Sequence, residues 1–230
     1  MAGESTAVSI AGRLADEIVA RDWPIGEVIG SEAELIERLG VSRGVLREAV
    51  RIVESYGIAR MRRGPGGGLV VSAPSVDAVA TSVALCLRFE RASRRQLFEL
   101  RVVIELAATA QAAARVDERA AERLRACVAT ERRRGYGDTL SSARPHSLHL
   151  LIAELSGNPA MRLFGRVLTD LTSGGAEDVT VAPKLAAAYG AAHHLIAEAI
   201  VAGDAPLAQL RMRRHLEAVA PVFQTEDGQF

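Results

Sequence analysis

Three histidines in the second half of the chain have the residue type and spacing of metal ligands. His215 is the single polar member of a core-facing row on the last predicted helix, and His193 lies in a comparable apolar row on the helix before it. If these helices form an antiparallel hairpin that turns at Gly203, both imidazoles lie at similar height, because each helical residue rises about 1.5 Å. His149 lies at the edge of the apolar face of an earlier helix. Three inward imidazoles from three helices can hold a metal ion in a bundle core.

The first half offers a different chemistry, that of a cationic helix face. Arg43, Arg47 and Arg51 recur every four residues on one predicted helix. Another face of this helix has an apolar stripe, formed by Val45, Ala49 and Ile52. A helix with this layout can dock on a core and present guanidinium groups to phosphates or base edges. The alternative is a solvated surface with salt bridges to Glu48 and Glu54.

The charge of the chain is local rather than global. Its 230 residues have a formal net charge of zero, with 49 % apolar and 24 % charged residues, as in a globular protein of one large or two ordinary domains. Residues 38–63 nevertheless contain seven arginines against two glutamates. Such a basic region within a neutral protein is what a DNA-binding face requires.

The sequence also predicts the compartment. Cys86 and Cys127 lie inside apolar helical patterns, which favours two buried thiols over a disulfide. We find no signal-peptide pattern and no run near the roughly 20 apolar residues of a membrane span. The chain is expected to be soluble and cytoplasmic, with no membrane partner.

A helix, a tight turn and a second helix position the arginines. Ser31 and Glu34 form a capping box, which begins a helix. Gly40 ends that helix, and Ser42 is placed to cap the next one. The predicted N-terminal helices cover about 8–20, 31–39 and 42–55.

A β-hairpin is expected after these helices. Residues 57–61 alternate in polarity, residues 64–68 read GPGGG, and residues 69–71 read LVV, an apolar run that favours an extended strand. Two short β-rich runs joined by a glycine tip predict a hairpin. Three helices followed by a hairpin make a winged helix-turn-helix.

The remainder of the chain is predicted to be helical throughout. Helical patterns occur near 76–90, 94–114, 118–134, 141–155, 159–172, 182–202 and 205–222. The predicted fold is therefore mostly α, a winged helix-turn-helix followed by an all-α bundle. The expected domains are 1–72 for DNA binding, a linker at 73–76, and 77–230 for effector binding and dimerisation.

In these patterns the chain resembles the GntR superfamily of bacterial transcription regulators, specifically the FadR-type subfamily with a C-terminal FCD effector domain. The N-terminal likeness rests on SEAELIERLGVSRGVLREAVRIVESYGI and the glycine-rich wing. The C-terminal likeness rests on LFELRVVIELAA, HLLIAELSGNPAM, HHLIAEAIVAGD and RMRRHLEAV. The resemblance implies a homodimer that binds a palindromic operator, expected to be a repressor, and that responds when a small metabolite enters the bundle.

The resemblance also assigns DNA contacts. The family's two recognition-helix arginines match Arg43 and Arg47, beside Ser42, and Arg51 continues their face. A further family arginine on the preceding helix is Ala33 here, so one expected DNA contact is missing. The wing adds the candidates Arg62, Arg63, Gly66 and Gly67.

In the bundle, His149, His193 and His215 match the family's three metal-binding histidines. The family's aspartate ligand falls at Pro145, which cannot ligate, so water, His146 or an effector carboxylate would complete the site. Three imidazoles favour zinc, nickel or manganese over magnesium or calcium. The alternative is three hydrogen-bonded core histidines in a metal-free pocket for an apolar or acyl effector.

Three residues are candidates for binding the effector. Arg101 lies in an apolar row and needs an anionic partner, and the family position helps to hold a carboxylate. The alternative is a structural ion pair with Glu105 or Glu99. Glu105 and Asn158 complete the candidate effector site, although Asn158 also has the position of a helix cap.

An all-α metalloenzyme that activates water on three histidines is the competing class. Such an enzyme needs a general base beside the metal. We find no carboxylate with helical spacing to a candidate pocket histidine that would serve, and the winged helix would have no role. The sequence therefore favours a regulator without catalytic residues.

Overall fold

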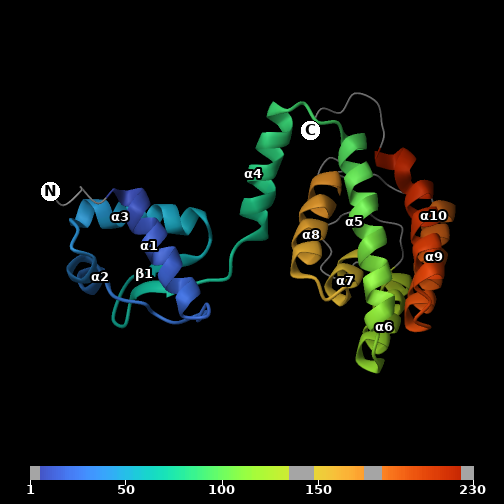
Figure 1. The fold of residues 1–230 in the computed structure, drawn as a ribbon, viewed down its shortest axis with the longest axis horizontal. Helices are drawn as coiled ribbons and strands as arrows, with labels where there is room; N and C mark the ends of the chain where they lie inside the picture. The colour runs from blue at the N-terminus through green and yellow to red at the C-terminus, as the bar shows by residue number, and fades with distance from the viewer. Residues whose placement is uncertain (1–5, 135–147, 174–182, 224–230) are drawn as a thin grey trace. The chain divides into compact units, whose positions relative to one another are not determined.

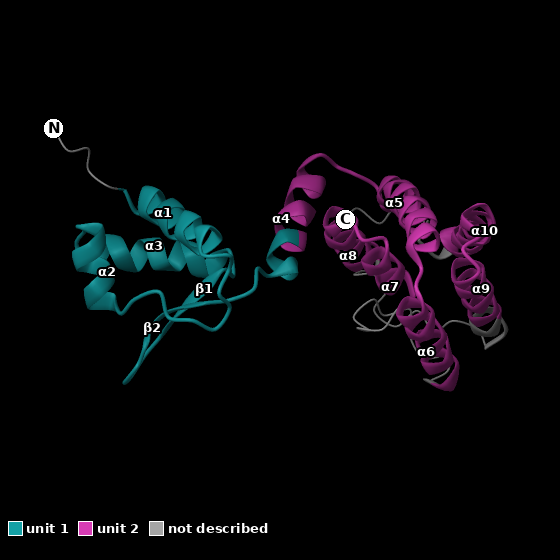
Figure 2. Ribbon diagram, turned by 60° about the horizontal axis from the view of Figure 1, so that its bottom comes forward, with its two compact units in different colours: residues 1–79 teal, residues 80–230 magenta. Residues whose placement is uncertain are grey.

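The computed structural model describes residues 6–134, 148–173 and 183–223. The chain divides into two compact units, Met1–Val79 and Ala80–Phe230 (Figure 2). This division falls inside helix α4 (Val76–Phe89), and the narrower limits at 72 and 77 remain a prediction. Among the described helices, none is both long and apolar enough to cross a membrane.

The N-terminal unit contains three helices, and the sequence predicted the caps of the second and third. They are α1 (Ala7–Ala20), α2 (Glu32–Leu39) and α3 (Arg43–Ser55) (Figure 1). The capping box of Ser31 and Glu34 begins α2, and Ser42 accepts a hydrogen bond from the backbone of α3. Gly40 ends α2 with a φ of 66°, a left-handed conformation that glycine adopts without strain. The helix-turn-helix prediction is confirmed.

The buried face of α3 differs from the predicted stripe. Its fully buried residues are Leu46, Ala49, Val50 and Val53. Val45 and Ile52 are only partly buried, and both lie at the same margin of this face. The observed buried face of α3 is therefore rotated by part of a turn from the predicted stripe, which left out Leu46. Leu46 belongs to the same core cluster as residues of α1 and β2. The arginines lie on the adjoining face, which is exposed.

The predicted hairpin is present and short. Strand β1 (Ala59–Arg62) pairs antiparallel with β2 (Gly68–Val71), with Ala59 opposite Val71 and Arg62 opposite Gly68. All four residues of β2 are buried, so the wing is anchored on the helices along its second strand. At the tip, a side chain on Gly67 would lie 2.3 Å from the carbonyl oxygen of Arg62, so this turn requires glycine.

The segment after β2 is bound to the same unit. The indole of Trp23 donates a hydrogen bond of 2.8 Å to the carbonyl of Ser72, and the Ser72 amide donates to Ile58. A side chain on Gly57 would meet Ser75 at 3.0 Å. Residues 72–75 therefore lie against the winged helix.

The C-terminal unit is an all-α bundle, as predicted. Its helices are α5 (Arg94–Arg115), α6 (Glu118–Arg134), α7 (Leu148–Leu155), α8 (Pro159–Ser173), α9 (Pro183–Val201) and α10 (Ala205–Phe223), together with most of α4. Helix α5 contacts α7, α8, α9 and α10 and is the centre of the bundle (Figure 1). The predicted helix over 141–155 is described only from Leu148, and Pro145 and His146 lie outside the described residues.

The two cysteines differ in environment. Both are free thiols, in agreement with the absence of a predicted disulfide. Cys127 is buried, and burial raises the pKa of its thiol to about 12. Cys86 is exposed, which contradicts its predicted burial, because α4 buries only Ala80 among its residues.

Candidate DNA-binding face and three-histidine site

The arginines of α3 lie on its outward face. The side chains of Arg43, Arg47 and Arg51 are 71 %, 66 % and 76 % exposed. The apolar face of the same helix is buried in the core. The fold therefore presents three guanidinium groups on the second helix of a helix-turn-helix, the element that enters the major groove in such proteins.

Glutamates contact these arginines, but not in the predicted pattern. Arg51 Nη1 lies 3.1 Å from Glu48 Oε2, as anticipated. Arg47 instead pairs with Glu32 on α2, at 3.2 Å between Nε and Oε1. Glu54 accepts a hydrogen bond of 2.9 Å from the backbone of Met61 and so ties α3 to the wing.

The wing residues have two different environments. The Arg62 side chain donates a hydrogen bond of 2.8 Å to the carbonyl of Gly66 and so braces the turn. The amide of Gly67 closes the turn on Gly64 at 2.8 Å. Arg63 is exposed at the tip. The structure thus brings the predicted wing residues together in one turn.

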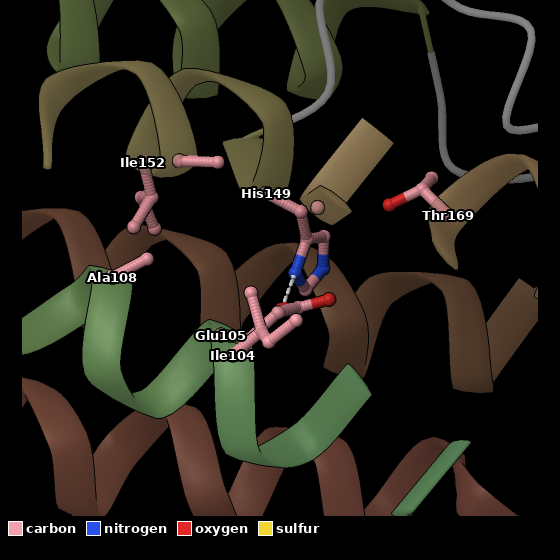
Figure 3. Close-up of a pocket in the computed structure, with 8 residues that line it drawn as sticks. Ile104, Glu105, Ala108, His149, Ile152 and Thr169 are labelled. Carbon is pink, nitrogen blue, oxygen red and sulfur yellow. Dashed lines mark hydrogen bonds and ion pairs between the residues drawn. The ribbon is translucent and has the colours of Figure 1, made fainter. Parts of the chain in front are cut away.

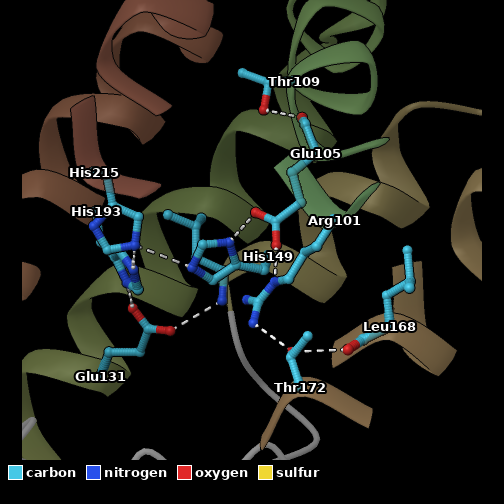
Figure 4. Close-up of polar contacts among 10 residues, drawn as sticks. Arg101, Glu105, Thr109, Glu131, His149, Leu168, Thr172, His193 and His215 are labelled. Atoms are coloured by element: carbon cyan, nitrogen blue, oxygen red, sulfur yellow. Dashed lines mark hydrogen bonds and ion pairs between the residues drawn. The ribbon is translucent and has the colours of Figure 1, made fainter. Parts of the chain in front are cut away.

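The three predicted histidines meet in the core of the bundle. His149, His193 and His215 come from α7, α9 and α10 (Figure 4). Nε2 of His215 lies 3.2 Å from Nε2 of His193 and 3.3 Å from Nε2 of His149. This confirms the expected hairpin of α9 and α10, with both imidazoles at the same height.

Two carboxylates, one buried and one partly buried, orient two of the histidines. Glu105 Oε2 contacts Nδ1 of His149, and Glu131 Oε2 lies 2.8 Å from Nδ1 of His193 (Figure 4). Glu131 Oε1 also accepts a hydrogen bond of 2.9 Å from the backbone of Leu148, at the start of α7. Carboxylates in this position fix the tautomer that leaves Nε2 available as a ligand.

The electrostatics keep two histidines neutral. Burial, together with the neighbouring His149 and His193, lowers the pKa of His215 to about 2. Burial also lowers the pKa of His193, against the raising effect of its hydrogen bond to Glu131. Neutral imidazole is the form that binds metal ions.

The two carboxylates are ionised, because neighbouring charges and hydrogen-bond donors outweigh the effect of burial on their pKa values. Burial raises the pKa of Glu105, but the charges of His149 and Arg101 outweigh it, and the pKa lies below its usual value. For Glu131, burial likewise raises the pKa, and the hydrogen bond from His193 brings it below the usual value. The site therefore combines two neutral imidazoles, His193 and His215, with anionic carboxylates that contact His149 and His193.

The donor set fits a divalent metal. A tetrahedral ion with nitrogen ligands at about 2.0–2.1 Å separates those nitrogens by roughly 3.3–3.4 Å, close to the two measured separations of 3.2 and 3.3 Å. All three ligand atoms lie within 4.8 Å of one another. Without an ion, three nitrogens that meet in the core would have few donors to satisfy them.

Arg101 lies in a structural ion pair. Its Nε is 2.5 Å from Glu105 Oε1, and its Nη1 donates to Thr172 Oγ1 at 3.0 Å. Both charged side chains are only 8 % exposed. The alternative of a pair with Glu105 is therefore present in this structure, and Glu105 is shared between Arg101 and His149.

The remaining effector candidate acts as a helix cap. The Asn158 side chain accepts hydrogen bonds from the backbone of Ala160 and Met161 at 3.0 and 3.4 Å, at the start of α8. A small pocket adjoins another effector candidate, Glu105, and one of the three histidines, His149 (Figure 3). It holds about 260 Å³ of space, partly open to solvent, and is lined by Ile104, Glu105, Ala108, His149, Ile152, Ala153, Gly165 and Thr169.

Sequence reasoning missed three residues of these sites. Glu131 continues the buried row of Leu124 and Val128 on α6, and this spacing could have revealed it. Thr172 and Glu32 gave no such signal, because their partners are 71 and 15 residues away in the sequence.

Comparison with known proteins now identifies both units. Residues 96–218 match the family model of the FCD domain, and residues 6–70 match that of the bacterial regulatory proteins of the gntR family. The chain belongs to the GntR family and carries an FCD domain. It is a transcription regulator of the ligand-responsive kind and not an enzyme, which removes the metalloenzyme alternative.

Individual relatives agree with this assignment. The GntR regulator is 27 % identical over 231 residues to a protein of Escherichia coli K12 described as "Putative L-lactate dehydrogenase operon regulatory protein", over 94 % of this chain and 88 % of the relative. A protein of Shigella flexneri with the same description matches equally. Among solved structures, Streptococcus agalactiae GntR is similar with a TM-score of 0.70 and 25 % identity, over 94 % of this chain and 99 % of that one.

Proposed function

We propose that this GntR regulator is a cytoplasmic, homodimeric repressor that binds a palindromic operator through α3 and the wing. The exposed arginine face of α3 carries this proposal. Ser42, Arg43, Arg47 and Arg51 contact the major groove and its phosphates. Arg62, Arg63, Gly66 and Gly67 contact the DNA from the wing. Because Ala33 cannot replace a family arginine, base readout depends more heavily on the α3 arginines.

Replacement of Arg47 by alanine is expected to weaken operator binding by about 1–3 kcal/mol, the range for a side chain that reads a base edge. Mobility shifts on an operator selected from random DNA by the wild-type protein measure this loss. Arg95→Ala is the matched control, since that exposed arginine lies on α5 and pairs with Glu99. Unchanged affinity in both Arg43→Ala and Arg47→Ala would remove the assignment of the recognition helix.

Exposed apolar side chains on α4 and α5 support dimerisation through the C-terminal unit. Leu85 and Phe89 on α4 are 61 % and 84 % exposed, and Val103 on α5 is 65 % exposed. Leu85 and Phe89 are four residues apart and share one face of α4. Exposed apolar residues that share a face are typical of a surface that a protein partner covers. A second copy is the partner that symmetric half-sites require.

Light scattering is expected to show a dimer in solution, both free and on operator DNA. Replacing the exposed Phe89 by glutamate should weaken this dimer, because the new charge would be buried in the interface. His194→Glu places the same charge on an exposed position of α9 and should have no effect. A wild-type monomer in both states would contradict the proposal.

For the effector site, we propose a divalent ion, zinc, nickel or manganese, held by His149, His193 and His215. Such an ion supplies an electrophilic centre that binds an anionic oxygen. Among the described residues of the cluster, Glu105 and Glu131 are anionic and Arg101 is cationic. With a divalent ion bound, the cluster would carry one positive charge, which one carboxylate effector would neutralise.

The size of the pocket favours a small effector. About 260 Å³ of space lies between the lining side chains, and part of it is open solvent, so the enclosed part is smaller still. A long acyl chain, the metal-free alternative, would require the bundle to open. The name of the E. coli relative makes L-lactate and other 2-hydroxycarboxylates the first compounds to test.

The contacts of Glu105 suggest how such an effector would act. Glu105 holds His149 on α7, while Arg101 holds Thr172 on α8. A carboxylate that competes with Glu105 for Arg101 would change the packing of both helices against α5. This change would bias the bundle between two states and so alter operator binding.

A further inference from the structure

Glu32 is an acidic residue within the basic face that binds DNA. It is the first residue of α2, and its Oε1 lies 3.2 Å from Arg47 Nε and 3.7 Å from Arg43 Nε. One carboxylate thus contacts two arginines that are one turn apart on α3. Its side chain is 37 % exposed, so the carboxylate is partly covered by its partners.

This contact contributes little to the stability of the fold. Ion pairs between exposed groups typically stabilise a protein by about 0–1 kcal/mol. Both arginine side chains are more than half exposed. The consequence of the contact is therefore geometric, because it restricts two long side chains that would otherwise sample many rotamers.

The geometry leaves the arginines able to bind DNA. Arg47 contacts Glu32 through Nε, the nitrogen nearest the helix, and a guanidinium has five donors in a planar fork. A guanidinium held at Nε has a defined plane and can direct its terminal nitrogens at a base. Loss of fewer rotamers on binding favours the specific complex.

The negative charge of Glu32, in contrast, weakens binding to DNA of any sequence. Non-specific binding arises from contacts between cationic side chains and phosphates. A carboxylate beside two of these cations reduces the local positive charge and repels phosphates. Only DNA that offers correctly placed base edges compensates for this repulsion.

We propose that Glu32 is a specificity-determining residue, which orients Arg47 and Arg43 for base contacts and weakens binding to non-operator DNA. This role rests on the proposed reading of DNA by the two arginines. Glu32 separates specific from non-specific binding because its geometry favours the first and its charge disfavours the second.

Two substitutions separate charge from geometry. Glu32→Gln removes the negative charge. Binding to a shuffled duplex should then tighten about threefold to tenfold at moderate salt. The slope of log affinity against log salt concentration should become steeper by about one unit, because about one more counterion is released. The ratio of operator to shuffled-duplex affinity should fall by a similar factor. In Glu32→Asp the charge stays but the shorter side chain cannot hold Arg47, so operator affinity should fall while shuffled-duplex affinity stays near that of the wild type.

Glu37→Gln is the matched control. Glu37 is exposed on the same helix, and no ion pair with an arginine is present for it among the described residues. This variant should change neither affinity. Thermal melting of all variants verifies the fold, and Glu32 is exposed enough that we expect melting temperatures close to the wild-type value.

The outcomes are distinct. If Glu32→Gln tightens both duplexes equally, or changes neither, the specificity role is wrong. Arg47→Ala on the same two duplexes tests the underlying function separately. If that variant loses operator affinity while Glu32→Gln keeps the wild-type ratio, recognition by α3 stands and only the role of Glu32 is overturned.

Discussion

Protein purified without chelator or affinity tag should contain close to one divalent metal ion per chain, and His193→Ala should weaken metal binding by at least about 100-fold. Loss of residues that only orient a ligand costs about 10–100-fold in affinity, so loss of a ligand should cost more. His193 Nε2 is one of the three proposed donors and lies 3.2 Å from His215 Nε2. Elemental analysis and competition with a coloured chelator measure content and affinity.

The adjacent histidine provides the control. His194 is exposed on α9, so His194→Ala removes an imidazole from the same helix without changing the site. Its metal content should equal that of the wild type. Metal content near zero in the wild type, unchanged in His193→Ala and accompanied by a co-purified long apolar ligand, would establish the metal-free alternative.

Replacing Arg101 by methionine should lower the stability of the C-terminal unit by about 3–5 kcal/mol, the usual effect of breaking one side of a buried ion pair. The pair with Glu105 is 8 % exposed on both sides, so the remaining carboxylate would stay buried beside His149. For a unit of this size the melting temperature should fall by roughly 6–20 °C. Calorimetry on metal-free protein measures the loss without the contribution of metal binding.

A pair on the surface of the same helix provides the comparison. Arg95 and Glu99 have the same spacing as Arg101 and Glu105, but their side chains are 73 % and 60 % exposed. Arg95→Met should therefore cost less than about 1 kcal/mol. The double variant Arg101→Met with Glu105→Gln should recover part of the lost stability, because no unpaired charge remains. Equal effects of Arg101→Met and Arg95→Met would show that burial of the pair does not matter.

Local patterns determined the elements of this protein and much of its site. Helix caps need residues only three positions apart, as in the box of Ser31 and Glu34, so the helix-turn-helix could be placed from sequence. The apolar rows around His193 and His215 predicted that both face the core, and the short connection at Gly203 predicted that they meet. These conclusions depend on periodicity and chain connectivity, which a sequence contains.

Partners distant in the sequence were decided by the tertiary structure alone. Glu131 contacts His193 across 62 residues, and Arg101 contacts Thr172 across 71. The sequence left Glu105 and Glu99 open as partners of Arg101, and the packing of α8 against α5 decided that the pair with Glu105 forms and is buried. Glu32 on α2 contacts Arg47 on α3, whereas Glu54 contacts the wing. Each residue turns a helix by about 100°, so the side chains that meet between two helices depend on how the helices are rotated against each other. The contact of Glu32 with the recognition arginines is therefore decided by the packing of α2 against α3.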